Sequence, residues 1–231
     1  MKDAKLQSIL KGCRLNDRIF SSLLKKLRRG EFETERDISR FIKKEIFKAR
    51  GALAFPPIVA IGKNAVDWHH KPTNSKLRNG GFCVIDFGSR FKRYCSDMTR
   101  TVYFGKANSA EKKIYAKVRR ANEICITKVR AGKDGHEIYM LARKILGSHA
   151  KYFGHGLGHG LKKIIHAKPR LSKKPNQILR EGDIITIEPG VYIPKKLGIR
   201  IEDDVLVAKK GYRLLSRSTK KVVEINAKQI F

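Results

Sequence analysis

Apolar residues at the start of the chain recur with the period of an α-helix. Positions 19–27 repeat an apolar residue every three or four steps, and Gly30 ends the pattern. Thr34 then stands in a capping position before a second amphipathic run over 38–46, which ends near Gly51. The pattern therefore predicts two successive helices.

Beyond residue 55 the apolar runs become short and lie between turn residues, which is typical of strands. Two longer amphipathic runs interrupt them. The predicted elements are, in order, strands over 58–61, 82–87 and 96–104, helices over 109–129 (capped by Ser109) and 135–147, and strands over 184–187, 191–193, 199–201 and 205–207. Two helices and a hairpin are thus followed by two helices and a hairpin. We expect an α+β fold with an internal pseudo-repeat, in one domain over residues 1–231.

The composition is that of a globular protein that stays in the cytoplasm. Hydrophobic residues make up 41% of the 231 positions, enough for a buried core despite a charged fraction of 32%. No apolar run reaches the roughly 18 to 20 residues of a membrane span, and the N-terminus lacks the pattern of a secretory signal. The cysteines form no CxxC pair, so we expect reduced structural thiols at Cys13, Cys83, Cys95 and Cys125.

The charge of the chain is strongly positive. Lysine and arginine number 52 against 21 acidic residues, which gives a formal net charge of +31. Such a surface attracts polyanions, so non-specific association with RNA is one expectation. The basic residues are nevertheless spread over almost every segment, which is more typical of a bias of the whole proteome. The charge therefore does not by itself indicate a nucleic-acid function.

Two acidic residues lie close to the turn of the first predicted hairpin. Asp86 stands in an apolar strand, where an unpaired carboxylate would cost several kcal/mol of desolvation. If the turn is centred on Phe91 and Lys92, Asp97 lies directly opposite Asp86, with the Cβ atoms roughly 5 Å apart. Two like charges so placed repel each other unless a cation lies between them.

The same arrangement recurs in the second predicted hairpin. Glu188 and Glu202 flank a turn centred near Lys195, so this hairpin also presents two acids on one face. Arg200 shares the face of Glu202 and is expected to orient a ligand carboxylate or to contact substrate. The next two acids, Asp203 and Asp204, are left out of the expected site, because Asp203 should face the other side of the strand. Four convergent carboxylates and a histidine would suit one or two divalent ions.

The histidines of the segment FGHGLGHG are candidates for the nitrogen ligand. His155 and His159 have an HxxxH spacing, but the alternating glycines disfavour a helix, and an extended segment would place both rings on one face. His166 and His69 are further candidates. Each of these residues has a purely structural explanation when taken alone, such as a carboxylate capped by backbone donors or a histidine in a turn. Their joint occurrence in one chain favours a metal site.

Three segments carry a resemblance to a known family: IDFGSRFKRYCSDMTRTVYFG, HGLGHG, and TIEPGVYIP followed by GIRIEDDVLV. They resemble the Xaa-Pro peptidase branch, prolidase and aminopeptidase P, of the metallopeptidases with the pita-bread (creatinase/aminopeptidase) fold. The resemblance extends from about Phe41 to Val207. It implies an α+β fold in which a pseudo-twofold repeat of helices and antiparallel strands surrounds a central site.

The resemblance also implies roles for individual residues. Two divalent ions are expected, manganese first, with cobalt, zinc or iron as alternatives. His159 matches the nitrogen ligand because it lies seven residues before His166. The residues that match metal ligands are Asp86, Asp97 (bridging), His159, Glu188 (also the general base) and Glu202 (bridging). The residues that match substrate-binding and catalytic histidines are His69, His155 and His166.

The function implied is that of a metal-dependent exopeptidase that hydrolyses Xaa-Pro bonds of dipeptides or short peptides. Relatives in this branch carry an N-terminal domain that is not found before Phe41, and we expect a monomer or weak dimer. Two departures from the family pattern are Lys162, in place of a glycine, and Ala167, in place of an acid. Two alternatives stay open. One is a methionine aminopeptidase, and the other is a non-catalytic relative that binds nucleic acid or ribosomes.

Overall fold

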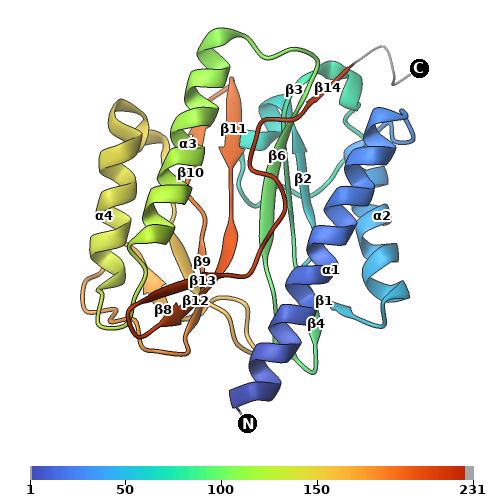
Figure 1. The fold of residues 1–231 in the computed structure, drawn as a ribbon. Coiled ribbons are helices and arrows are strands. Elements are labelled where there is room, and N and C mark those ends of the chain that lie inside the picture. The colour runs from blue at the N-terminus through green and yellow to red at the C-terminus, as the bar shows by residue number, and fades with distance from the viewer. Residues whose placement is uncertain (1, 227–231) are drawn as a thin grey trace.

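The computed structural model describes residues 2–226 and places two pairs of helices on opposite sides of the strands (Figure 1). The first pair, α1 (Lys2–Arg28) and α2 (Glu35–Lys48), contributes to one hydrophobic core. The second pair, α3 (Ser109–Thr127) and α4 (Gly135–Leu146), contributes to another. The expected order of elements is confirmed, and each half of the pseudo-repeat has a core of its own.

The helix boundaries follow from local capping and from packing. Thr34 caps α2 as predicted, and it exchanges hydrogen bonds with Asp37 in a capping box. The cap of α3 is Asn108 and not Ser109: the Asn108 side chain accepts the Glu111 N–H at 3.0 Å. α1 begins at Lys2, well before the apolar run at 19–27, because its first turns pack on a small third core. The early part of α1 was therefore missed.

The strands form four sheets among the described residues. They are a four-stranded sheet in the order β14-β6-β3-β2, a five-stranded sheet in the order β13-β12-β9-β7-β8, a pair β10-β11 and a three-stranded sheet β1-β4-β5. The bounds are β1 Ala52–Leu53, β2 Ile58–Ile61, β3 Gly81–Phe87, β4 Ser89–Phe91, β5 Tyr94–Cys95, β6 Met98–Phe104, β7 Gly158–Gly160, β8 Ala167–Leu171, β9 Ile184–Ile187, β10 Gly190–Ile193, β11 Leu197–Arg200, β12 Asp203–Ala208, β13 Gly211–Leu214 and β14 Glu224–Ile225. Short 3-10 helices occur at Gly62–Val66 (η1), Leu77–Asn79 (η2) and Gly147–Tyr152 (η3).

The first acidic hairpin, residues 81–104, has a register that differs from the prediction. Asp86 pairs with Thr99, and the turn consists of Lys92 and Arg93, which both have positive φ angles (46° and 70°). A two-residue hairpin turn of this type needs positive φ at both positions. The turn expected at Phe91–Lys92 was wrong by one residue, so Asp97 lies diagonally from Asp86 and still on the same face.

The second acidic hairpin, residues 184–208, has the expected register. Gly190 pairs with Arg200 across β10 and β11, and the turn is centred on Lys195. This register places Glu188 opposite Glu202. Both glutamates lie where the chain leaves the five-stranded sheet and enters the pair β10-β11. The change of sheet releases both residues from the ladders and turns their side chains toward the centre of the fold.

Candidate metal centre

Three buried side chains from different elements converge at the centre of the fold. Asp97 precedes β6, His159 lies in β7, and Glu202 lies between β11 and β12. Each offers one ligand atom, and these atoms all lie within 4.8 Å of one another. Carboxylate oxygens and an imidazole nitrogen at such separations can hold a divalent cation. The structure thus gathers three of the five expected ligands into one cluster.

The ring of His159 is oriented so that its Nε2 atom faces carboxylates. Nδ1–H donates to the Gly160 carbonyl oxygen at 3.3 Å, while Nε2 lies 3.7 Å from Asp97 Oδ2 and 3.5 Å from Glu188 Oε1. Burial lowers the pKa of His159 to about 3, so the ring is neutral and Nε2 carries a lone pair. A lone pair that faces two carboxylates calls for a cation between them. Glu188 therefore joins the cluster as a fourth member.

Glycines on both sides of His159 let β7 lie against its neighbours. A Cβ atom on Gly158 would lie 1.9 Å from the Thr186 carbonyl oxygen, and one on Gly160 would lie 2.4 Å from the Lys168 carbonyl oxygen. No other residue type fits at these positions. The expected extended structure is thus confirmed around His159. The other histidine of the motif, His155, precedes β7 in a bend.

Asp86 lies in β3 and is held by Arg200. Arg200 Nη2 donates to Asp86 Oδ2 at 2.6 Å, and Nη1 donates to the Tyr192 hydroxyl at 2.7 Å. The Tyr192 hydroxyl then donates to His155 Nε2 at 2.8 Å. Burial, and after it the positive charge of Arg200, lowers the pKa of His155 to about 3. A continuous polar chain therefore links the fifth expected ligand to a neutral histidine, and any contact of Arg200 with substrate stays a prediction.

The hydroxyl of Thr99 connects the two acidic hairpins. It donates to Glu202 Oε2 at 2.6 Å and accepts from Arg200 Nε at 3.2 Å. Thr99 is the residue that pairs with Asp86 in the first hairpin, whereas both partners lie in the second. The unexpected register of the first hairpin therefore places a hydrogen-bonding group at the point where the hairpins meet.

Four buried carboxylate oxygens of this region have no hydrogen-bond partner among the described residues. They are Asp86 Oδ1, Asp97 Oδ1 and Glu202 Oε1 of the expected ligands, and Asp204 Oδ1 beside Asp97. Burial, and then the neighbouring carboxylates, raise the pKa of Asp97 and of Glu202 well above the usual range, and burial raises the pKa of Glu188 to about 8. Unpaired buried carboxylates cost several kcal/mol each unless cations or protons compensate them. The residues present therefore fit divalent metal ions.

The remaining histidines lie at different distances from the cluster. The ring of His166 lies 4.6 Å from that of His159, and His155 Nδ1 lies 4.0 Å from Glu188 Oε2. His69 is exposed, and its ring packs edge-on against Trp68, which in turn lies 5.8 Å from the ring of His155. Two of the three expected substrate histidines thus adjoin the cluster directly. The third reaches it through an aromatic neighbour.

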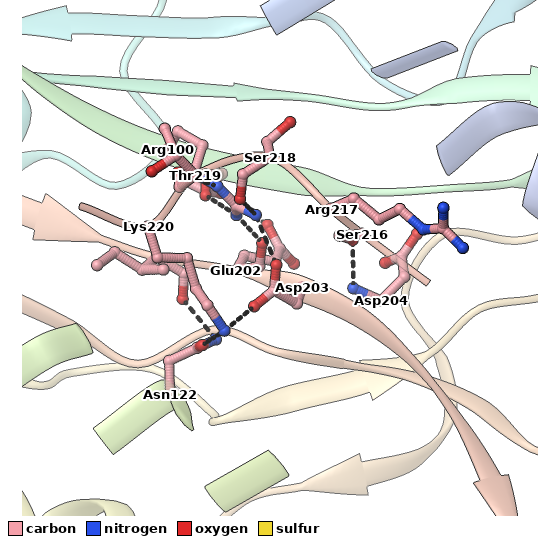
Figure 2. Close-up of polar contacts among 12 residues, drawn as sticks. Arg100, Asn122, Glu202, Asp203, Asp204, Ser216, Arg217, Ser218, Thr219 and Lys220 are labelled. Carbon is pink, nitrogen blue, oxygen red and sulfur yellow. Dashed lines mark hydrogen bonds and ion pairs between the residues drawn. The ribbon is translucent and has the colours of Figure 1, made fainter. Parts of the chain in front are cut away.

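Asp204 is not among the expected site residues, but it holds the backbone of one member of the cluster, Asp97. Its Oδ2 accepts the backbone N–H of Asp97 at 3.0 Å and the thiol of Cys13 at 3.2 Å. Figure 2 shows that Asp203 points the other way, toward Arg100 and Lys220, as its strand position predicted. The two-residue period that excluded Asp203 places Asp204 on the face of Glu202, and this signal was available in the sequence.

Glu35 is a second residue that the sequence analysis missed. Its buried carboxylate accepts hydrogen bonds from the backbone N–H of Ile61 and of Thr73, both at 2.8 Å, and from the Asn64 side chain at 2.9 Å. It also contacts His70 Nε2 at 2.9 Å. These bonds hold both ends of the segment that carries His69. No local sequence pattern predicts these contacts, because the hydrogen-bond partners lie 26 to 38 residues from Glu35 along the chain.

Comparisons with known proteins agree on one family. Residues 7–209 match the model described as Metallopeptidase family M24. The Xaa-Pro dipeptidase of Pyrococcus horikoshii is 32% identical over 225 residues, which cover 96% of this chain and 63% of that protein. The crystal structure of a prolidase from Thermococcus sibiricus superposes with a TM-score of 0.91 at 33% identity, and covers 96% of this chain and 61% of that one.

A further structural neighbour is the X-Pro aminopeptidase of Thermotoga maritima. It has a TM-score of 0.90 at 29% identity, with coverage of 96% of this chain and 64% of that one. The pita-bread fold expected from the sequence is therefore confirmed. The chain spans less than two thirds of the length of each of these three proteins.

In the part of the chain that the structure describes, none of the helices combines the length and the apolar character of a membrane span.

Proposed function

The chain belongs to metallopeptidase family M24, and from this premise we propose that it is an exopeptidase that hydrolyses Xaa-Pro bonds of dipeptides or short peptides. The observation that carries the proposal is the cluster of Asp97, His159 and Glu202, in which a neutral imidazole faces unpaired buried carboxylates. The names of the similar proteins, Xaa-Pro dipeptidase and prolidase, support this substrate class.

Five residues would hold the metal in this proposal: Asp86, Asp97, His159, Glu188 and Glu202. Two divalent ions, when bound there, would lower the pKa of a water molecule so that it can attack a peptide carbonyl. A set of one imidazole and four carboxylates discriminates weakly among such ions. Manganese is our first choice, and cobalt, zinc and iron are alternatives. Asp86 keeps one oxygen for this task, because Arg200 occupies only Oδ2.

Glu188 is the proposed general base. It lies between the imidazoles of His155 and His159, and divalent ions bound beside it would keep its carboxylate deprotonated, as a group that takes a proton from water must be. His155 and His166 would donate hydrogen bonds to the carbonyl oxygen as negative charge develops on it. In the structure His155 donates its one N–H, at Nδ1, to Gly156 O and accepts from the Tyr192 hydroxyl at Nε2, so donation to substrate requires that one of these contacts be exchanged or that the ring take up a second proton. His69 would contact the other side of the substrate.

The proposal extends to the surroundings of the enzyme. The four cysteines are free and buried, which supports a reducing compartment such as the cytoplasm. A monomer or weak dimer, and a single catalytic domain over residues 1–231, stay predictions. A non-catalytic role is disfavoured because all five ligand positions are filled by residues that can bind metal.

The direct test compares two dipeptide bonds. We expect hydrolysis of Ala-Pro after addition of manganese, inhibition by a chelator, and little hydrolysis of Met-Ala in the same assay. Preferential cleavage of Met-Ala would favour the methionine aminopeptidase alternative. Failure to cleave either peptide, or longer Xaa-Pro peptides, with any of the four metals would contradict the proposed function.

A second proposal follows from the charge of +31. We propose that the protein associates weakly with polyanions such as RNA, independently of catalysis. A steep loss of RNA binding with rising salt would be the expected signature.

A further inference from the structure

A concave basic pocket lies at the tip of the first acidic hairpin. It has a volume of about 470 Å³ and is lined by four exposed cations, Arg50, Arg90, Lys92 and Arg93, around the ring of Phe91. None of the four forms an ion pair with any residue in the described range. Four like charges that converge without a partner repel one another, so an anion placed among them would be bound favourably.

The backbone of this pocket adopts conformations that are unfavourable for its residues. Arg50, Lys92 and Arg93 have φ angles of 55°, 46° and 70°. Glycine and asparagine adopt such angles at little cost, and Asn-Gly is the preferred pair for a hairpin turn like that of Lys92 and Arg93. In this pocket all three residues with positive φ angles instead have long cationic side chains. Strained backbone of this kind is often found at ligand-binding sites.

The positive surface continues from the pocket onto neighbouring elements. Lys11 of α1 lies 4.4 Å from the centre of the Phe91 ring, and Lys163 lies 5.9 Å from the centre of the Tyr94 ring. The Cys95 N–H donates to the Lys162 carbonyl oxygen at 3.0 Å, which keeps the Lys162–Lys163 segment beside the hairpin. A ligand with several linked negative groups could therefore contact the pocket and its flanks together.

We propose that this basic pocket binds phosphate groups of a polyanion, either a short oligophosphate or the backbone of a single-stranded RNA. Three of the four lining cations are arginines, whose planar guanidinium groups bind phosphate oxygens in pairs. The pocket belongs to the outer part of the hairpin, away from the ladder that holds Asp86, so binding does not depend on the proposed peptidase activity.

The test measures binding of a labelled single-stranded RNA by fluorescence anisotropy over a series of salt concentrations. The variant Lys92→Asn/Arg93→Gly supplies the favoured turn residues and removes two positive charges. We expect its affinity to fall about tenfold and the salt slope to fall by roughly 1.4. Its melting temperature should rise by about 2–4 °C as backbone strain is relieved.

The matched control is Lys209→Gln/Lys210→Gln. These lysines also form a two-residue turn, between β12 and β13, and lack positive φ angles. The control removes the same net charge from residues that do not line the pocket, and because the proposal assigns binding to the pocket we expect it to change affinity by less than about twofold. A second variant, Arg50→Gln/Arg90→Gln, leaves the turn intact and should weaken binding like the first.

Competition experiments identify the source of the phosphate groups. Displacement of RNA by tripolyphosphate would identify a site for oligophosphates, and resistance to it would identify an extended site for a nucleic-acid backbone. Either result is consistent with the proposal. Equal loss of affinity in the pocket and control variants, or equally good displacement by polyglutamate, would overturn it, because each would show attraction by net charge alone.

Discussion

The two acidic hairpins bring carboxylates to the same centre by different geometry. In the second hairpin, Glu188 and Glu202 oppose each other where both strands change sheets. In the first, Asp86 pairs with Thr99, and Asp97 lies immediately before the first residue of β6. The offset leaves room opposite Asp86 for a hydroxyl that contacts both Glu202 and Arg200. The pseudo-repeat thus supplies two carboxylates from each hairpin. The difference in register between the hairpins places the Thr99 hydroxyl where it joins the two halves.

The largest effect is expected from removing one ligand of each hairpin. Asp97→Ala and Glu202→Ala should both lose bound metal, and Ala-Pro hydrolysis should fall roughly 10³-fold or more because the activated water is lost. Metal content after gel filtration and the hydrolysis rate check this. Glu181→Ala, which removes an exposed acid, is the control. Normal metal content in either ligand variant would show that the two hairpins do not share a metal centre.

The next largest effect distinguishes the proposed general base, Glu188, from a proposed metal ligand, Asp86. Glu188→Gln should lower kcat for Ala-Pro by about 10²- to 10⁴-fold, since the proposed general base is removed, while much of the metal stays bound. Asp86→Asn should instead lower metal affinity, because the neutral amide balances less of the metal charge. Metal titrations and steady-state kinetics on both variants distinguish the roles. Full activity of Glu188→Gln would rule out its assignment as the base.

A smaller effect concerns the stability of the metal-free protein against pH. Burial raises the pKa of Glu188 and of Asp204 to about 8 in the folded state, so these groups hold protons that the unfolded chain has released. Their stabilising contribution is present at low pH and is lost as the pH rises toward 8. We expect a loss of roughly 2 kcal/mol per group between pH 6.5 and 8.

Urea unfolding at several pH values, with and without manganese, measures this dependence. The buried histidines have lowered pKa values, so they reduce stability only as the pH falls below about 6.5 and do not contribute in the same window. Added metal should weaken the trend, because it binds the deprotonated carboxylates. Rising stability of the metal-free protein between pH 6.5 and 8 would contradict the proposed cause.

The smallest effect tests the contact between the hairpins. Thr99→Val keeps the shape of the side chain and removes the hydroxyl that bonds Glu202 and Arg200. We expect the free energy of unfolding to fall by about 1–3 kcal/mol, because buried polar partners lose their hydrogen bonds. Thr99→Ser should restore much of it. If the serine variant is as unstable as the valine variant, packing of the methyl group and not hydrogen bonding explains the role of Thr99.

The two hairpins also differ in how much of their geometry the sequence predicts. The second hairpin was predictable because its turn is short and its acids are symmetric about Lys195. The turn of the first hairpin was not predictable, because its two residues, Lys92 and Arg93, are neither glycine nor asparagine, which normally indicate such a turn. Glu35 was missed because its contacts are distant along the chain. Asp204 was missed although strand periodicity placed it on the correct face.

The thiol of Cys13 binds the same Asp204 oxygen that holds the backbone of Asp97. The first helix therefore contacts the candidate metal centre through an oxygen atom that also holds Asp97 in place. Deletion or replacement of the N-terminal residues up to and including Cys13 would remove this contact. The position of Asp97 in the buried cluster should then change as well.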